Sequence, residues 1–180
     1  MKKLCILFIA FLFSACHTNA PNNVVFKTSF SLEKQKILQT ADSIIKSAYY
    51  TSLITLDANY QPRVRIVEPF SPEKNYVIWM ATNPKSRKVT QLKNNSSATL
   101  HYFDKNKLAY VSLMGNAFLV NDIASKNKFW KDGWEKFYPN KDNDYLLIKF
   151  VPKSLELISI SDGFTGDNTT WKPHLVTLVE

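Results

Sequence analysis

The sequence has three arginines, and all of them lie between residues 63 and 87. On a strand, Arg63 and Arg65 would point to the same side. Arg87 stands between Ser86 and Lys88, where a strand-like run ends and a short helix could begin. Backbone N–H groups at a helix start, a hydroxyl and two cations suit a phosphate, and arginine adds a planar fork. The spacing therefore predicts that the arginines converge on one phosphate; the alternative is an exposed helix start beside two solvent-facing arginines.

Other residue types with chemical potential are scattered. His101, in the strand-like run TLHYF, could be a proton donor or haem ligand, although a lone strand histidine is more often a hydrogen-bonded structural residue. His17 and His174 lie far from it in the sequence. No group of His, Cys and carboxylates has metal-binding spacing, and no nucleophile with a base and an orienting acid can be assembled. The sequence thus predicts no metal site and leaves the catalytic residues, if the protein is an enzyme, unidentified.

The elements that must position these residues are mostly strands. After residue 50, β-branched and aromatic residues recur with a period of two, and short polar connections such as DANYQP and DKNK suit hairpins. Many short strands with few helices predict an antiparallel barrel or sandwich, in which Gly115 would mark a bend or bulge. The predicted strands are Ser52 to Leu56, Arg63 to Glu68, Tyr76 to Ala81, Ala98 to Phe103, Leu108 to Val120, Tyr145 to Val151, Ser154 to Ile160, and an edge strand in HLVTLVE.

Three helices are predicted around this sheet. The run LEKQKILQTADSIIKSA has apolar residues at helical spacing after Ser31, a candidate N-cap. The second helix covers Ser86 to Lys93 and the third covers Asp122 to Phe137. In the third, Trp130 and Trp134 are four residues apart and would share a face, with core packing favoured over stacking on a ligand.

The order of these elements resembles the FMN-binding split-barrel family, which includes pyridoxamine 5'-phosphate oxidase and the shorter general-stress flavin-binding proteins. The resemblance covers roughly Lys34 to Ser159. Its most specific part is Thr82-Asn83 followed by Ser86-Arg87-Lys88, which matches the oxidase motif at the same spacing. The implied fold is mainly β with flanking helices, an antiparallel split β-barrel.

The resemblance also implies roles for individual residues. Arg65 would contact the FMN phosphate, and Ser86, Arg87 and Lys88 would hold its phosphate and ribityl end. Tyr110 falls where the oxidase uses a glutamine from the partner subunit, so the family implies a homodimer with two flavins at the interface. The implied FMN-binding residues are Arg65, Ile66, Val67, Thr82, Asn83, Ser86, Arg87, Lys88 and Tyr110.

The sequence departs from the oxidase at its C-terminal end. The oxidase has an R-x-H motif for its substrate, whereas this chain has no arginine after Arg87. Oxidation of pyridoxamine phosphate is therefore not expected. The segment FWKDGWEKFYP instead resembles a tryptophan-rich helix of the general-stress type.

The N-terminus has the pattern of a lipoprotein signal peptide. Lys2 and Lys3 precede an apolar run too short for a stable membrane anchor. The run ends in Phe13-Ser14-Ala15-Cys16, which resembles the lipobox, so Cys16 would be lipidated; the alternative is an ordinary thiol near a cleavage site. This predicts a signal peptide over 1–15, a polar tether over 16–30 and one domain over 31–180.

Charge and location narrow the possible partners. The formal net charge is +8, mostly from dispersed lysines, and an exported location argues against nucleic acid. His17 after Cys16 favours the outer membrane, facing the periplasm. The leading hypothesis is a lipid-anchored FMN flavoprotein, an oxidoreductase of unknown substrate. The alternatives are a non-catalytic haem- or flavin-binding carrier lipoprotein, or an envelope barrel without a ligand.

Overall fold

The computed structural model describes residues 22–178, and the side chains discussed below belong to residues 31–178. The predicted signal peptide and Cys16 therefore lie outside the described residues. Within 22–178, no helix is both long enough and apolar enough to cross a membrane.

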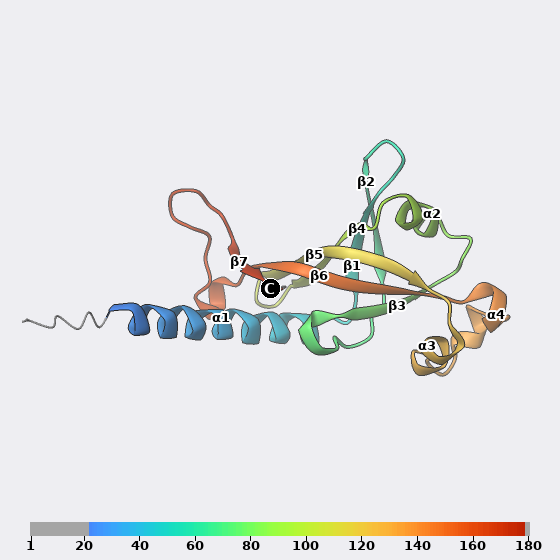
Figure 1. Ribbon diagram of the computed structural model, residues 1–180, viewed down its shortest axis with the longest axis horizontal. Helices are drawn as coiled ribbons and strands as arrows, with labels where there is room; N and C mark the ends of the chain where they lie inside the picture. The colour runs from blue at the N-terminus through green and yellow to red at the C-terminus, as the bar shows by residue number, and fades with distance from the viewer. Residues whose placement is uncertain (1–21, 179–180) are drawn as a thin grey trace, which may run out of the picture.

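The described chain forms one antiparallel sheet of seven strands, in the order β2-β1-β4-β5-β6-β3 with β7 on β6. Figure 1 shows the two longest strands, β5 and β6, running side by side through the centre. The strands are β1 (Thr51–Leu56), β2 (Pro62–Val67), β3 (Ile78–Thr82), β4 (Ser97–Asp104), β5 (Ala109–Val120), β6 (Leu146–Ile158) and β7 (His174–Thr177).

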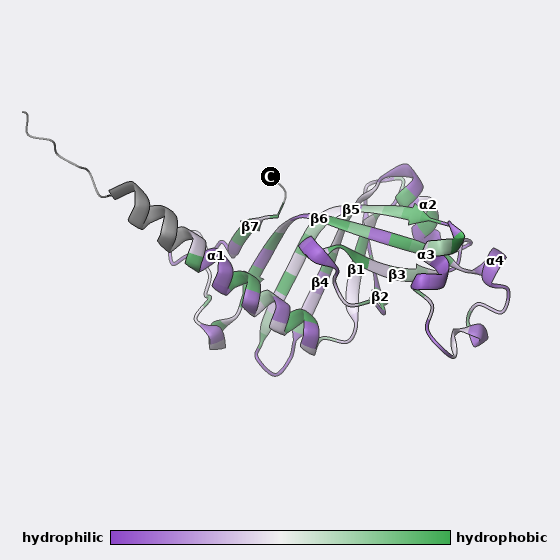
Figure 2. Ribbon diagram, turned by 60° about the horizontal axis from the view of Figure 1, so that its bottom comes forward, coloured by the Kyte–Doolittle hydropathy of each residue, from purple (hydrophilic) through white to green (hydrophobic). Residues whose placement is uncertain are grey.

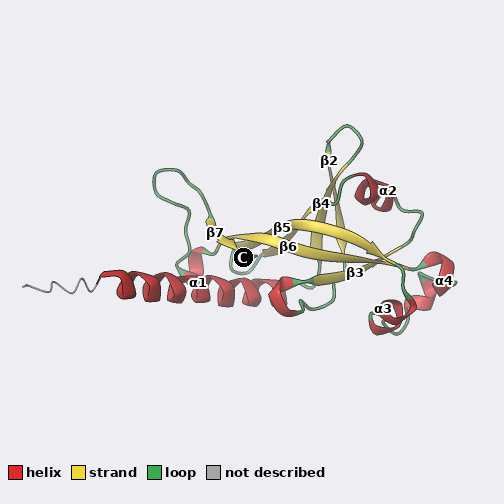
Figure 3. Ribbon diagram, viewed as in Figure 1, coloured by secondary structure: helices red, strands yellow, loops and turns green. Residues whose placement is uncertain are grey.

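The sheet curls until its two edges approach each other. Beyond β2, Pro69 forms an isolated antiparallel bridge with Met80 of β3, and the N–H of Phe70 donates to the carbonyl of Trp79. The inner face holds a continuous apolar core that includes Leu53, Leu100 and Phe150. A curled antiparallel half-barrel with a few helices confirms the predicted fold class, and Figure 3 shows how few helices flank it.

Helix α1 (Asn22–Ser47) packs beside the sheet and contributes the buried residues Ala41 and Ile44 to the core. Over residues 31–47, Figure 2 shows hydrophobic and hydrophilic residues alternating along the helix, and the buried ones, Ile37, Ala41, Ile44 and Ile45, recur at the spacing of an amphipathic helix. Ser31 lies inside the helix, so its prediction as the N-cap is wrong. The helix begins at Asn22 and so extends into the segment predicted as a tether.

Two predicted strands form one strand in the structure. Strand β6 continues from Leu146 to Ile158 without interruption, although Pro152 lies within it. Pro152 is opposite Gly115, where the register between β5 and β6 shifts by a bulge. A bulge accommodates a proline that lacks a ladder donor, so the strand bends there instead of ending.

The predicted helix from Asp122 to Phe137 is wrong as a single element. The chain forms α3 (Ile123–Lys128) and a 3-10 turn (Trp134–Lys136), separated at Gly133, whose φ is 82°. Trp130 and Trp134 still meet edge to face, with ring centroids 6.1 Å apart. They belong to an aromatic cluster on the outer side of β3, which agrees with the packing role. The remaining helical elements are α2 (Arg87–Asn94), α4 (Lys141–Asp144) and 3-10 turns at Lys74–Tyr76 and Ile160–Asp162.

Candidate functional site

Arg65, on β2, is held in place by residues of two other elements, β1 and α2. Its position on β2, opposite Leu53 of β1, directs its side chain to the inner side of the curled sheet. The guanidinium donates to the carbonyl of Leu53 (3.1 Å), the hydroxyl of Thr55 (2.6 Å) and the amide oxygen of Gln91 (2.7 Å). These bonds use three of its five N–H donors. In the described part of the chain the other two have no protein acceptor, so they remain available to a ligand.

The second part of the site connects the end of β3 to the start of α2. The hydroxyl groups of Thr82 and Ser86 are hydrogen bonded at 2.9 Å, and the Lys88 ammonium donates to Thr82 at 3.0 Å. Ser86 stands at the N-cap position of α2 but makes no capping bond. The N–H of Val89 donates to the carbonyl of Ser86 at 2.9 Å, so the N–H groups of Arg87 and Lys88 are the ones left to an external acceptor, which favours an anion.

The cations of this site have no carboxylate beside them. The ion pairs formed by residues 31–178 involve none of Arg65, Arg87 or Lys88. Burial, together with Arg87, lowers the pKa of Arg65, and burial, together with Arg65, lowers the pKa of Lys88. A group of cations in which the pKa values of Arg65 and Lys88 are both lowered predicts a strong preference for an anion. Arg65, Thr82, Ser86, Arg87 and Lys88 are called the cation cluster below.

Arg63 does not join the cation cluster, so the prediction that all three arginines converge is wrong. It pairs with Asp57 across the hairpin between β1 and β2, with 2.7 Å between its guanidinium and the carboxylate. Its side chain is 52% exposed. Arg63 and Arg65 are two residues apart on β2, as predicted for side chains of one face. The Asp57 carboxylate, however, forms an ion pair with Arg63.

The other residues predicted to bind FMN are Ile66, Val67, Asn83 and Tyr110. The side-chain oxygen of Asn83 accepts from the backbone of Lys85 and shapes the turn before α2. Val67 packs against the core, whereas Ile66 is exposed on the outer face of β2. Tyr110 lies on β5, separated from β2 by β1 and β4. Within one chain, therefore, Tyr110 cannot complete the same site.

Two residues that hold Arg65 in place, Gln91 and Thr55, were not predicted from the sequence. Gln91 accepts hydrogen bonds from both Arg65 and Thr55, and so fixes the arginine between α2 and β1. Gln91 follows Arg87 by four residues, which places both on one face of a helix. That spacing could have predicted that Gln91 lies near the cation cluster. The position of Thr55 beside Arg65 could not be predicted, because it depends on how β1 pairs with β2.

His101 lies on the outer face of the sheet. Its Nδ1 is 2.9 Å from the hydroxyl of Ser112, directly opposite on β5, and its ring is tilted beside Tyr110 at 5.4 Å. This hydrogen bond agrees with the structural reading of His101. No group of three or more potential metal ligands occurs in the described residues.

The burial of His101 predicts a pH dependence of stability. Burial lowers the pKa of His101 below its ordinary 6.5, so the unfolded chain binds more protons near that pH. Its contribution is fully present above about pH 6.5 and is lost as the pH falls through the lower folded value. In urea unfolding at about pH 7.5 and about pH 5, His101→Gln should lose less stability on acidification than the wild type. An equal loss in both would contradict this.

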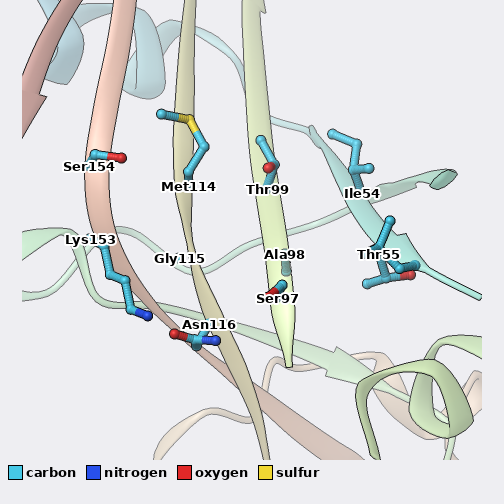
Figure 4. Close-up of a pocket in the computed structure, with 11 residues that line it drawn as sticks. Ile54, Thr55, Ser97, Ala98, Thr99, Met114, Gly115, Asn116, Lys153 and Ser154 are labelled. Carbon is cyan, nitrogen blue, oxygen red and sulfur yellow. The ribbon is translucent and has the colours of Figure 1, made fainter. Parts of the chain in front are cut away.

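A shallow hollow lies on the same outer face. It has a volume of about 370 Å³, and its lining includes Ile54, Thr99, Met114 and Lys153 (Figure 4). Val64 and Ile66, on the neighbouring strand, are 64% and 65% exposed. On the outer face, exposed apolar side chains of β2 thus lie near a hollow whose lining is partly apolar and partly polar.

Comparisons with known proteins agree with this geometry. Residues 36–164 match the family model described as pyridoxamine 5'-phosphate oxidase like. A solved structure from Clostridium acetobutylicum, a protein related to general stress protein 26 of Bacillus subtilis, is 25% identical. It has a TM-score of 0.66, over 79% of this chain and 95% of that chain. A search of curated proteins found no significant match.

More distant structures share the fold alone. A pyridoxamine 5'-phosphate oxidase-related, FMN-binding protein from Nostoc punctiforme is 12% identical, with a TM-score of 0.56 over 91% of this chain and 99% of that chain. A haem-binding protein from Mycobacterium smegmatis is 14% identical, with a TM-score of 0.57 over 77% of this chain and 56% of that chain. Neighbours of this fold therefore include proteins described with different cofactors.

Proposed function

Because the chain belongs to the pyridoxamine 5'-phosphate oxidase like family, we propose that it binds FMN and acts as an oxidoreductase on a small partner. The observation that carries this proposal is the cation cluster. It joins three cations, two hydroxyl groups and an uncapped helix start without a carboxylate. A phosphate monoester dianion suits this donor set, because it can accept several charge-assisted hydrogen bonds.

The residues of the cation cluster fit the phosphate end of the cofactor. Arg65 offers two unused N–H donors, and Arg87 and Lys88 add positive charge. Ile66 and Val67 continue along β2 from Arg65, where the flavin would meet the backbone. Bound FMN would supply the redox chemistry, while the protein supplies orientation and electrostatics. Oxidation of pyridoxamine phosphate is not proposed, since no arginine follows Arg87.

A homodimer would complete the proposed site. The exposed apolar face formed by Val64, Ile66 and the hollow beside Met114 suits a second copy of the chain. Tyr110 and His101 lie on this face. A second copy could thereby bring its Tyr110 to a flavin held by the first, which one chain cannot do.

Ligand titration tests the proposed function directly. The purified full chain is titrated with FMN and with riboflavin, which lacks the phosphate, and flavin fluorescence is followed. We expect micromolar or tighter binding of FMN, much weaker binding of riboflavin, and twice the monomer mass on sedimentation of the FMN complex. A protein that remains colourless and binds FMN no better than riboflavin would refute the proposal.

The second candidate function is haem binding by a carrier protein. His101 favours it, because Ser112 engages its Nδ1 and its ring lies beside that of Tyr110 on the outer face of the sheet. Haem titration would then give a Soret band that is lost in His101→Ala and kept in Arg87→Ala. FMN binding predicts the reverse pattern for the two variants.

The proposed location rests on the lipobox-like sequence before Cys16. Two or three acyl chains on this cysteine would anchor the domain, since each buried methylene contributes about 0.8 kcal/mol. We expect the wild type to partition into detergent with a mass increment for diacylglycerol at Cys16. Cys16→Ser should partition into the aqueous phase. Wild type without a lipid mass increment would contradict the proposed anchor.

A further inference from the structure

The guanidinium of Arg65 is held along one of its edges. Its Nη1 donates to the hydroxyl of Thr55 at 2.6 Å and to the carbonyl of Leu53 at 3.1 Å, and its Nη2 donates to the amide oxygen of Gln91 at 2.7 Å. The side-chain oxygens of Thr55 and Gln91 are only 2.6 Å apart. Two acceptors this close together take the parallel N–H groups at the end of the fork, one from each terminal nitrogen.

The other edge of the same guanidinium is unused. By elimination, it consists of the N–H on Nε and the remaining N–H on Nη2, which also run parallel. No acceptor for these two groups occurs in the part of the chain that the structure describes. Arg65 is partly exposed, so a ligand can reach this edge. A pair of parallel donors matches two oxygens of one phosphate.

The direction of each hydrogen bond around Arg65 is fixed by chemistry. An arginine N–H can only donate, so the Thr55 oxygen must accept from Arg65 and give its own proton to Gln91. For the same reason the oxygen of the Gln91 amide, and not its NH2 group, must face the arginine. Thr55 is only 1% exposed, which limits competition from water. Arg65 therefore has one favoured orientation, and Gln91 supplies the acceptor from α2 that decides it.

The side chain on α2 that holds Arg65 is neutral. Arg63, two residues earlier on β2, is paired with the carboxylate of Asp57, whereas none of the ion pairs within residues 31–178 includes Arg65. A carboxylate in place of the Gln91 amide would have nearly the same shape and would accept the same two bonds. It would also cancel one positive charge of the cation cluster. The amide thus orients the arginine and leaves its full charge for an anion.

We infer that Gln91 is a positioning residue for an incoming phosphate. It holds one edge of the Arg65 guanidinium, directs the other edge to the ligand and leaves the charge of the cation cluster intact. The inference rests on the proposed function for the identity of the phosphate, which would be that of FMN. The same arrangement would accept another phosphate, so inorganic phosphate provides a separate test.

Two substitutions in the full chain separate the charge of residue 91 from its hydrogen bonds. Gln91→Glu keeps the acceptor and adds a negative charge, whereas Gln91→Met keeps the length of the side chain and removes the acceptor. We expect Gln91→Glu to weaken FMN binding about tenfold or more, because the added charge repels the phosphate dianion. Gln91→Met should weaken it less, about two- to fivefold, through the loss of one orienting hydrogen bond. Flavin fluorescence measures both Kd values, and riboflavin binding should change little in either variant.

Thermal unfolding of the unliganded proteins distinguishes a positioning role from a purely structural one. Gln91→Glu should melt no lower than the wild type, because the carboxylate gains an ion pair with Arg65. Gln91→Met should melt lower, because Arg65 and the buried hydroxyl of Thr55 lose their acceptor. The variant with the lower affinity for FMN should thus be the more stable one. A structural role would make affinity and melting temperature fall together, and that result would overturn the inference.

The matched control makes the same chemical change on a different helix. Gln35→Glu introduces a carboxylate at an exposed position of α1 and should leave FMN affinity unchanged. If the wild type prefers FMN to riboflavin but Gln91→Glu binds FMN equally well, the inference is wrong and the proposed function stands.

Inorganic phosphate decides the inference if the wild type binds FMN no better than riboflavin, a result that would refute the proposed cofactor. Compared with chloride at equal ionic strength, phosphate should then raise the melting temperature of the wild type more than that of Gln91→Glu. An equal rise in the two proteins would overturn the inference as well.

Discussion

Replacing Arg87 and Lys88 together with alanine is expected to weaken FMN binding by about a hundredfold or more. Each charge-assisted hydrogen bond to a phosphate contributes about 1.5–3 kcal/mol, and about 1.4 kcal/mol corresponds to a tenfold change in Kd. Arg65 remains, fixed by Thr55 and Gln91, so some affinity for the dianion should persist. Flavin fluorescence quenching measures both Kd values.

Three comparisons show whether the loss comes from the phosphate. Lys93→Ala removes a cation from the last turn of the same helix, away from the cation cluster, and should leave FMN affinity unchanged. Binding of riboflavin should fall little in the double variant. The unliganded double variant should melt no lower than the wild type, because it removes charges close to Arg65. Equal losses for FMN and riboflavin would place the two cations elsewhere than at the phosphate.

The local part of the cation cluster could be predicted from the sequence. The motif from Thr82 to Lys88 is short, and its turn and helix start follow from Asn83, Pro84 and Ser86 alone. The sequence could not predict that Arg65 joins the cation cluster while Arg63 does not, because period-two spacing gives both the same face. Asp57 captures one across the hairpin, while Gln91 and Thr55 hold the other. These contacts depend on how β1, β2 and α2 meet.

The errors in element boundaries have a similar origin. The sequence predicts two strands, Tyr145 to Val151 and Ser154 to Ile160, with Pro152 in the gap between them. The structure places it opposite Gly115 in a bulge, a pairing that only the register of β5 with β6 reveals. In the same way, Gly133 interrupts an otherwise helical pattern by adopting a left-handed φ. Local patterns predicted where most of the strands lie, but long-range pairing decides where they bend or stop.

Gly115→Ala is expected to destabilise the domain by about 3 kcal/mol or more, a crowding effect at the upper end of overpacking costs. A Cβ added to Gly115 would lie 2.2 Å from the carbonyl oxygen of Val151 and 2.6 Å from the Cα of Pro152. Both contacts are backbone atoms of β6, so no side-chain rotation can relieve them. Urea unfolding of the two proteins at neutral pH measures the difference in the free energy of unfolding.

Gly133→Ala is the matched control for this effect. Gly133 has a φ of 82°, yet a Cβ there would meet no atom within 4 Å, so the substitution adds backbone strain without crowding. That strain costs about 1–2 kcal/mol. Gly115→Ala should therefore lower the free energy of unfolding clearly more than Gly133→Ala.

Gly115→Ala should also disturb the hollow on the outer face beside Met114 and weaken dimerisation of the FMN complex, because the bulge shapes that face. If Gly115→Ala is as stable as the wild type, β5 and β6 do not approach each other at this bulge, and the curvature of the sheet has another cause.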